Sequence, residues 1–229
     1  MGSLLLIGAA ACAVAVGLAT TATTGPYGYV VPALDDASVQ QISYTPLCTQ
    51  DEIPVCVHPA FSGDLGPASA VLGPVLDEVA GLPGAPTRAE QIDAADLPGA
   101  RDPARGSGMS DYSVGISLDT TADGGPVLEY GFDDQYDFTQ PATSGYLRGQ
   151  AAQAVFGYVV DPNGDADPAQ QAVESGLSQA AGASVTGADT TVATAAQRFA
   201  ALSSAQRHTW LVANLARLRA GQVTLEELP

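Results

Sequence analysis

The sequence predicts an α+β, helix-rich fold: an N-terminal transmembrane helix, then an extracytoplasmic domain with a few short strands and a helical C-terminal third. Three observations support this prediction. Residues 1–34 contain no charged side chain. The middle of the chain has short apolar stretches separated by Pro and Gly, which is typical of strands and turns. The last third has apolar residues at helical spacing after good N-cap residues.

The composition limits the classes of function. The chain is acidic: 25 Asp and Glu stand against 8 Arg and no Lys, which gives a formal net charge of −17. Nucleic-acid binding needs cationic groups that displace counterions, and no basic stripe exists, so no nucleic-acid partner is expected. The charge also disfavours docking on anionic lipid headgroups and favours a soluble exposed domain. The hydrophobic content of 46% is enough for a packed core.

The N-terminal segment is interpreted as a membrane anchor. Residues 4–19 are continuously apolar or small, and residues 20–24 are only mildly polar. A spanning helix needs about 20 apolar residues, whereas the apolar core of a signal peptide has about 7–15. The first three residues lack the positive charge of a signal peptide, and the residues before Cys12 make a poor lipoprotein site. We expect residues 4–24 to cross the lipid bilayer outward; a cleaved signal peptide and a buried soluble helix are the alternatives.

This interpretation divides the chain into three parts. Residues 1–24 are the transmembrane helix or membrane anchor, residues 25–47 a juxtamembrane linker, and residues 48–229 the extracytoplasmic domain. The missing basic flank indicates the last span of a longer membrane protein. The expected location is the cell membrane, with the main domain outside the cytoplasm.

Two cysteines lie at the start of the expected exterior domain. Cys48 and Cys56 have a spacing that is typical, outside the cytoplasm, of a disulfide closing a small loop. The chain-entropy model gives such a short loop roughly 2–3 kcal/mol of stabilisation. A metal site that adds His58 and a pair of free thiols are the alternatives, but no second Cys/His pair follows at zinc-finger spacing.

The elements of the exterior domain follow from local patterns. Residues 53–57 predict a strand that ends at His58, because the next residue is Pro. Thr87 and Glu90 have capping-box spacing, which predicts a short helix to about residue 95. Asp167 and Ser203 are good N-caps for later helices. The remaining predictions are a helix at 64–79, a loop at 97–108, strands at 112–118 and 127–132, and helices at 144–160, 167–181, 190–202 and 203–220.

The motifs of common hydrolases and nucleotide-binding proteins are missing from the sequence. There is no HExxH, no GxSxG and, without Lys, no P-loop. The two histidines, His58 and His208, suit a structural cap and a surface position. A Ser-His-Asp triad assembles in space without fixed spacing, so a hydrolase with an unrecognised site stays an alternative. We expect no catalytic residues, no enzyme activity and no cofactor.

One polar run has the start of a calcium loop. Asp161, Asn163, Asp165 and Asp167 place oxygen atoms at loop positions 1, 3, 5 and 7. The pattern then fails, because Ala166 replaces the loop glycine and the final Glu is missing. These four residues are a weak calcium candidate. The favoured interpretation is a turn between helices.

Two stretches resemble a known family. Residues 55–88, which include VCVHPAF and LGPVLDEVAGLPGAPTR, and residues 196–229 are similar to the outward-facing C-terminal region of actinobacterial multi-pass proteins. Those proteins are described as permease-like components of ABC transporters. The resemblance implies a last membrane span followed by an exterior domain. It also implies an ABC ATPase partner, reached through a membrane portion that this sequence does not contain.

A fainter likeness connects the chain to gluzincin aminopeptidases. A short strand, HPAF, a long helix and Gly-x-Pro resemble the segment that precedes the zinc helix of those enzymes. The following helix here has LRGQAAQA at residues 147–154, without ligand or base. The likeness therefore implies a degenerate, peptidase-like domain without a catalytic metal.

The sequence predicts a non-enzymatic exterior domain of a transporter-type membrane protein that binds a ligand or partner outside the cell. A secreted or lipid-anchored binding protein is the second hypothesis. The hydrolase with an unrecognised site is the third.

Overall fold

The computed structural model divides the chain into two compact units, Met1–Ser43 and Tyr44–Pro229. It describes residues 23–24, 30–31, 45–92, 115–120, 124–131, 141–183 and 189–229. In the first unit the described residues form two short antiparallel strands, β1 (Thr23–Thr24) and β2 (Val30–Val31).

The expected transmembrane helix lies almost entirely outside the described residues. Its last two residues, Thr23–Thr24, form strand β1, and the expected boundary at residue 24 stays a prediction. Threonine is β-branched and favours a strand, here paired with Val30–Val31. Within the described ranges, no helix has both the length and the apolar character needed to cross a membrane.

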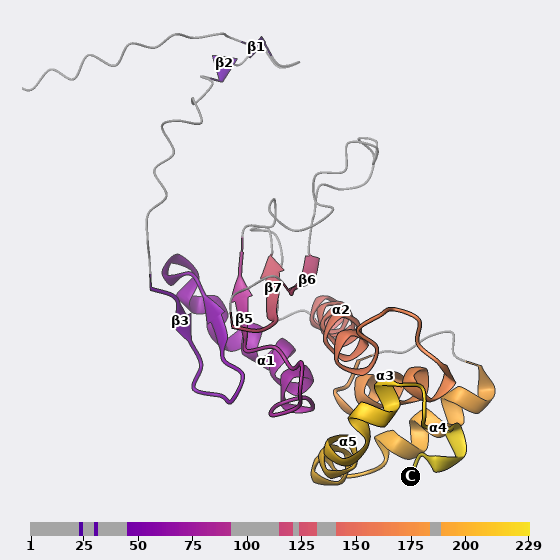
Figure 1. Cartoon of the computed structure of the whole chain (residues 1–229). Helices are drawn as coiled ribbons and strands as arrows, with labels where there is room; N and C mark the ends of the chain where they lie inside the picture. The colour runs from indigo at the N-terminus through magenta and orange to yellow at the C-terminus, as the bar shows by residue number, and fades with distance from the viewer. Residues whose placement is uncertain are drawn as a thin grey trace, which may run out of the picture. The chain divides into compact units, whose positions relative to one another are not determined.

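The second unit has a mixed five-stranded sheet (Figure 1). Its order is β3-β4-β5-β7-β6; the three central strands are parallel, and each edge strand is antiparallel to its neighbour. The strands predicted near residues 53–57, 112–118 and 127–132 are present, although residues 112–114 and the predicted loop at 97–108 are not described. The strands are β3 (Leu47–Cys48), β4 (Val55–Val57), β5 (Arg88–Gln91), β6 (Gly115–Asp119) and β7 (Val127–Gly131).

The helical C-terminal third is confirmed, and so is the α+β class. Asp167 and Ser203 both cap their helices through reciprocal capping boxes, with Gln170 and Gln206. The helices are η2 (Pro59–Asp64), α1 (Leu65–Asp77), α2 (Pro141–Val160), α3 (Pro168–Ala180), α4 (Thr190–Ala200), α5 (Ser204–Arg219) and η4 (Leu225–Glu227).

The short helix predicted from Thr87 is wrong, because this segment is strand β5. Ala89 is fully buried between Val55 of β4 and Leu128 of β7, its partners on either side. Two parallel ladders satisfy the backbone of β5, and this tertiary pairing outweighs a local capping pattern.

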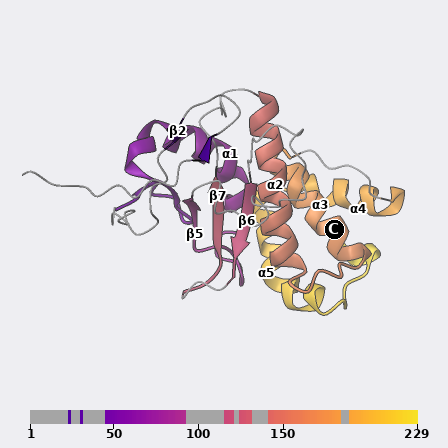
Figure 2. The same ribbon diagram turned by 90° about the horizontal axis from the view of Figure 1, so that it is seen from above.

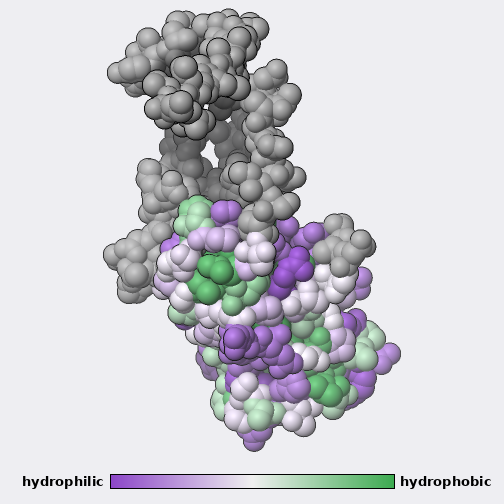
Figure 3. All heavy atoms as spheres, turned by 90° about the vertical axis from the view of Figure 1, so that its left-hand side faces the viewer, coloured by the Kyte–Doolittle hydropathy of each residue, from purple (hydrophilic) through white to green (hydrophobic). Residues whose placement is uncertain are grey.

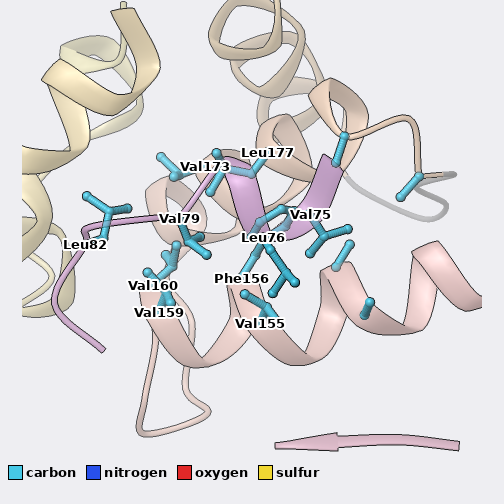
Figure 4. Packing of buried hydrophobic residues seen from close by; sticks show 14 of the residues in the cluster. Val75, Leu76, Val79, Leu82, Val155, Phe156, Val159, Val160, Val173 and Leu177 are labelled. Carbon is cyan, nitrogen blue, oxygen red and sulfur yellow. The ribbon is translucent and has the colours of Figure 1, made fainter. Parts of the chain in front are cut away.

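One apolar core joins the sheet to the helices. Helix α1 packs on β4, α2 packs on α1 and β6, and α3 packs on α2. Figure 2 shows α2 between the sheet and the helices α3 and α4. In Figure 4, Leu76 of α1, Phe156 of α2 and Val173 of α3 meet in this core, and each is almost fully buried. Burial of side chains of this size contributes roughly 1.5–3 kcal/mol each.

A buried ion pair connects the end of α1 to the start of α5. Arg207 donates from Nε to Glu78 Oε2 at 2.8 Å and from Nη2 to Glu78 Oε1 at 2.5 Å. The residues are only 6% and 7% exposed. The remaining nitrogen of Arg207, Nη1, donates to two carbonyl oxygens at the end of α4. These are the oxygen of Ala200, at 3.1 Å, and that of Leu202, which follows the helix. One guanidinium therefore holds three segments together.

Two further arginines bind backbone carbonyls across elements. Arg148 of α2 donates to Ala70 O of α1 at 2.9 Å. Arg219, at the end of α5, donates to Val159 O of α2 and to Pro83 O, each at 2.7 Å. These contacts fix α2 against α1 and α5 against α2.

We expect Arg207→Met to lower the free energy of unfolding by about 3–5 kcal/mol, because it leaves the Glu78 carboxylate buried without its cation. Urea denaturation followed by circular dichroism measures the loss. The control is Arg217→Met, which breaks an exposed ion pair with Glu227 and should cost about 0–1 kcal/mol. Equal losses for the two variants would contradict a dominant role for the buried pair.

Candidate functional site

The two cysteines that were predicted to pair lie opposite each other at the edge of the sheet. Cys48 of β3 and Cys56 of β4 are cross-strand partners, and their sulfur atoms are at disulfide distance, 2.11 Å. Cys48 is exposed, whereas Cys56 is 2% exposed. Thr49 adds a backbone and a hydroxyl contact to Val55, at 2.9 and 3.0 Å. With both sulfurs joined, the alternative metal site with His58 loses two of its three ligands.

His58 ends β4, as predicted, and caps the following helix η2. Its ring nitrogen Nδ1 accepts a hydrogen bond from Ala60 N at 3.1 Å, and its own backbone N donates to Gln91 Oε1. The ring meets Phe61 edge-on at 6.0 Å between centroids. Phe61 and Leu47 are 43% and 41% exposed. Figure 3, which looks onto this side, shows apolar residues reaching the surface among hydrophilic ones.

Tyr130 connects strand β7 to the disulfide-bonded strand β4. The sequence has no signal for this role. Its hydroxyl donates to Cys56 O at 2.6 Å in the buried interior. Strand β5 lies between β7 and β4, so this side chain reaches across a whole strand. Burial raises the pKa of the Tyr130 hydroxyl well above its ordinary range, and Asp64 and Glu90 raise it further. The hydroxyl therefore stays protonated and acts as a donor.

The register aligns a row of polar residues across the sheet. In this row, the hydroxyl of Ser117 donates to Glu129 at 3.2 Å. Glu90 receives a hydrogen bond from Arg88 at 2.7 Å. Each carboxylate thus has its own partner, unlike a catalytic pair that shares one proton. The complete row is Cys48, Cys56, Glu90, Glu129 and Ser117.

In chain order, helix α2 takes the position at which the faint gluzincin likeness would imply a zinc helix. The preceding order of strand, His58, long helix and Gly-x-Pro is present in β4, η2, α1 and the turn that follows. On α2 itself, Gln150 donates to the hydroxyl of Tyr146 at 2.7 Å, and Gln153 is exposed. Amides neither bind zinc in the usual way nor transfer protons at neutral pH. At these two positions the helix therefore offers amides for polar contacts rather than a zinc ligand or a general base.

The weak calcium candidate forms a turn between α2 and α3. Asp161 accepts a hydrogen bond from Asn163 N at 3.2 Å, as expected of an Asx-type turn. Asp167 accepts from the backbone N of Ala169 and Gln170 at 2.8 and 2.9 Å. Among the residues that the structure describes, no three His, Cys, Asp or Glu side chains converge to hold a metal. The carboxylates thus serve turn and cap chemistry.

Glu174 is a half-buried acid between α3 and α2. A methyl group added at Gly157 of α2 would lie 3.8 Å from Glu174 Oε1, an ordinary van der Waals contact, so this carboxylate lies next to α2. Burial raises the pKa of Glu174, and the nearby Asp161 raises it further. The raised pKa has no signal in the sequence, because Glu174 is one polar residue on an amphipathic helix.

His208 makes a contact inside the folded unit, whereas a surface position was expected. It is half-buried, and its Nε2 lies 3.1 Å from Ala80 O. This contact joins α5 to the turn after α1, beside the Arg207 ion pair. We therefore assign His208 a structural role.

Comparison with known proteins gives no family assignment: no protein-family model, curated protein or solved structure matches the chain.

We expect Asp167→Ala to lower the free energy of unfolding by about 1 kcal/mol, because it removes the N-cap of α3. Asp165→Ala, at an exposed position of the same turn, should change it by less than about 0.5 kcal/mol. Denaturation in calcium and in EDTA should give the same values. A stabilisation by calcium that both variants abolish would instead support a calcium site.

Glu174→Gln should make stability less dependent on pH. Because the folded pKa is raised, the contribution of Glu174 is fully present below its unfolded pKa and is lost as pH rises through the folded value. The variant should therefore unfold at higher urea than wild type at pH 7, and the two should converge near pH 4. Glu226→Gln, at an exposed position, is the control and should leave the profile unchanged.

Proposed function

We propose that the chain is a non-enzymatic extracytoplasmic domain of an ABC permease-like membrane protein, which binds a ligand or partner outside the cell. Residues 4–24 would hold it in the lipid bilayer. The observation that carries the proposal is the covalent pair of Cys48 and Cys56 at the start of the folded unit. Such pairs persist in oxidising compartments and are rare in the cytosol.

The chemistry of the described side chains supports a binding role over catalysis. The residues that usually perform catalysis are used to hold the fold: the cysteines form the crosslink, His58 and Asp167 cap helices, and His208 contacts a backbone carbonyl. A general acid–base catalyst needs a partner group within hydrogen-bond reach of a reacting atom. Asp161, the charged neighbour of Glu174, accepts a hydrogen bond from Asn163 N and so belongs to the turn after α2.

The charge distribution supports a partner that is not an anionic surface. Arg148, Arg207 and Arg219 direct their guanidinium groups to carbonyls and a carboxylate inside the domain. They are therefore not available to phosphates, whereas most of the acidic side chains that the structure describes lie in turns and at helix ends. A neutral or cationic ligand fits this surface better than lipid headgroups or nucleic acid.

Thiol labelling in whole cells tests the location. In a Cys12→Ser background, Cys48 and Cys56 are the remaining cysteines, so labelling reports on them alone. We expect an impermeant maleimide to give no labelling of intact cells, and two additions after an impermeant phosphine reductant. Labelling that needs cell lysis and no reductant would place the domain in the cytosol and overturn the proposal.

The two alternative functions have their own readouts. Intact mass of the membrane-bound protein should include the N-terminal segment; loss of the first twenty or so residues would favour a secreted or lipid-anchored protein. Zinc analysis together with a panel of peptidase substrates should show neither bound metal nor turnover. Turnover that Gln150→Ala leaves intact would point to a hydrolytic site elsewhere and overturn the non-enzyme proposal.

A further inference from the structure

The chain enters the second unit through a segment with little burial. Residues 45–52 are exposed or half-buried, whereas Ile53 and all three residues of β4 are buried. Strand β3 is an edge strand of two residues, Leu47–Cys48. Edge segments with exposed backbone hydrogen bonds and few apolar contacts open at low free-energy cost.

The disulfide joins this weak segment to a strongly held strand. Its inner residue, Cys56, pairs with Glu90 of β5 in the parallel ladder. The carbonyl of Cys56 also receives the buried hydrogen bond from Tyr130 of β7 at 2.6 Å. Cys56 is therefore tied to two other strands, whereas Cys48 depends on the short β3 ladder.

We propose that the Cys48–Cys56 disulfide is a mechanical clamp that fixes where the N-terminal part of the chain is attached to the folded unit. A pull on the residues before Cys48 passes through the two sulfur atoms into buried strand β4. Without the bond, the same pull peels residues 45–52 from the sheet edge and stops at Ile53, where burial begins. The inference rests on the proposed membrane attachment, which supplies the pull.

The clamp controls the length of the tether by a predictable amount. Cys48 and Cys56 are separated by 8 positions in sequence, but their Cα atoms are 4.1 Å apart. Without the bond, peeling stops at Ile53, so the connection gains the five positions from Cys48 to Ile53. Five extended residues span at most about 17–18 Å, which is the upper limit of the added length.

The surroundings of the bond suit a permanent clamp rather than a redox switch. A dithiol reductant would attack the exposed Cys48 sulfur as a thiolate, break the S–S bond and expel Cys56 as a thiolate. The second thiol of the reductant then closes its own disulfide, and both cysteines end as protonated thiols. The expelled thiolate would lie in a buried strand, where burial disfavours negative charge.

Single-molecule pulling of the full-length protein in detergent, with handles at its two ends, tests the clamp. We compare wild type with the double variant Cys48→Ser/Cys56→Ser; Cys12→Ser is the control. The double variant should gain a separate low-force extension of up to about 18 Å before the main unfolding step, which should stay at the wild-type force. Wild type and Cys12→Ser should lack this step.

Two results would overturn the clamp. One is that the double variant releases the extra length only together with global unfolding. The other is that the double variant fails to fold and phosphine-treated wild type also unfolds globally. The clamp requires that loss of the bond releases only the sheet edge. The pulling result is independent of cellular location. If labelling gives the expected result and pulling does not, the proposed function stands without the clamp. If pulling gives the expected result and labelling does not, the clamp stands, but the membrane attachment that would pull on it is lost.

Discussion

The buried pair of Glu78 and Arg207 is the constraint on which the arrangement of the second unit depends. Glu78 follows α1, which packs on the sheet, and Arg207 lies in the first turns of α5. Taking both charges out of water is costly, so the pair persists only because the guanidinium makes two bonds to the carboxylate and two to backbone carbonyls. A shift of either helix would leave a charge buried alone. The main effect of the pair is therefore to specify one arrangement of α1 and α5. Its contribution to the net free energy of unfolding is smaller.

The same logic explains how a strongly acidic chain uses its few cations. Guanidinium groups present five donors in a fixed plane, which suits carbonyl groups left open at helix ends. Arg148, Arg198, Arg207, Arg217 and Arg219 all donate to backbone carbonyls, and four of these contacts connect different elements. Among the described residues, arginine therefore serves mainly as an internal crosslink. Glu78 and Asp167 also have structural roles, whereas exposed acids such as Asp165 and Glu226 contribute to solubility.

Local patterns predict the elements whose stability is local, and they fail where tertiary contacts decide. Asp167 and Ser203 supply their caps within one turn, so the starts of α3 and α5 could be predicted to within a residue or so. Strand β5 could not, because its state depends on two partner strands distant in sequence. Nor could the reach of Tyr130 to Cys56, which needs the strand order. The disulfide was predictable from spacing, whereas the buried role of Arg207 has no sequence signal.

The amount of apolar burial decides which parts of this unit are stabilised by packing and which need a covalent bond. The helices and the central strands bury large apolar side chains, so packing and a few guanidinium contacts are enough. Strand β3 buries almost nothing: Leu47 is 41% exposed and Cys48 is exposed too. Hydrogen bonds in such an exposed position contribute little net free energy, because water competes for them. A covalent bond is the remaining way to fix the edge, and it stands where the chain enters the folded unit.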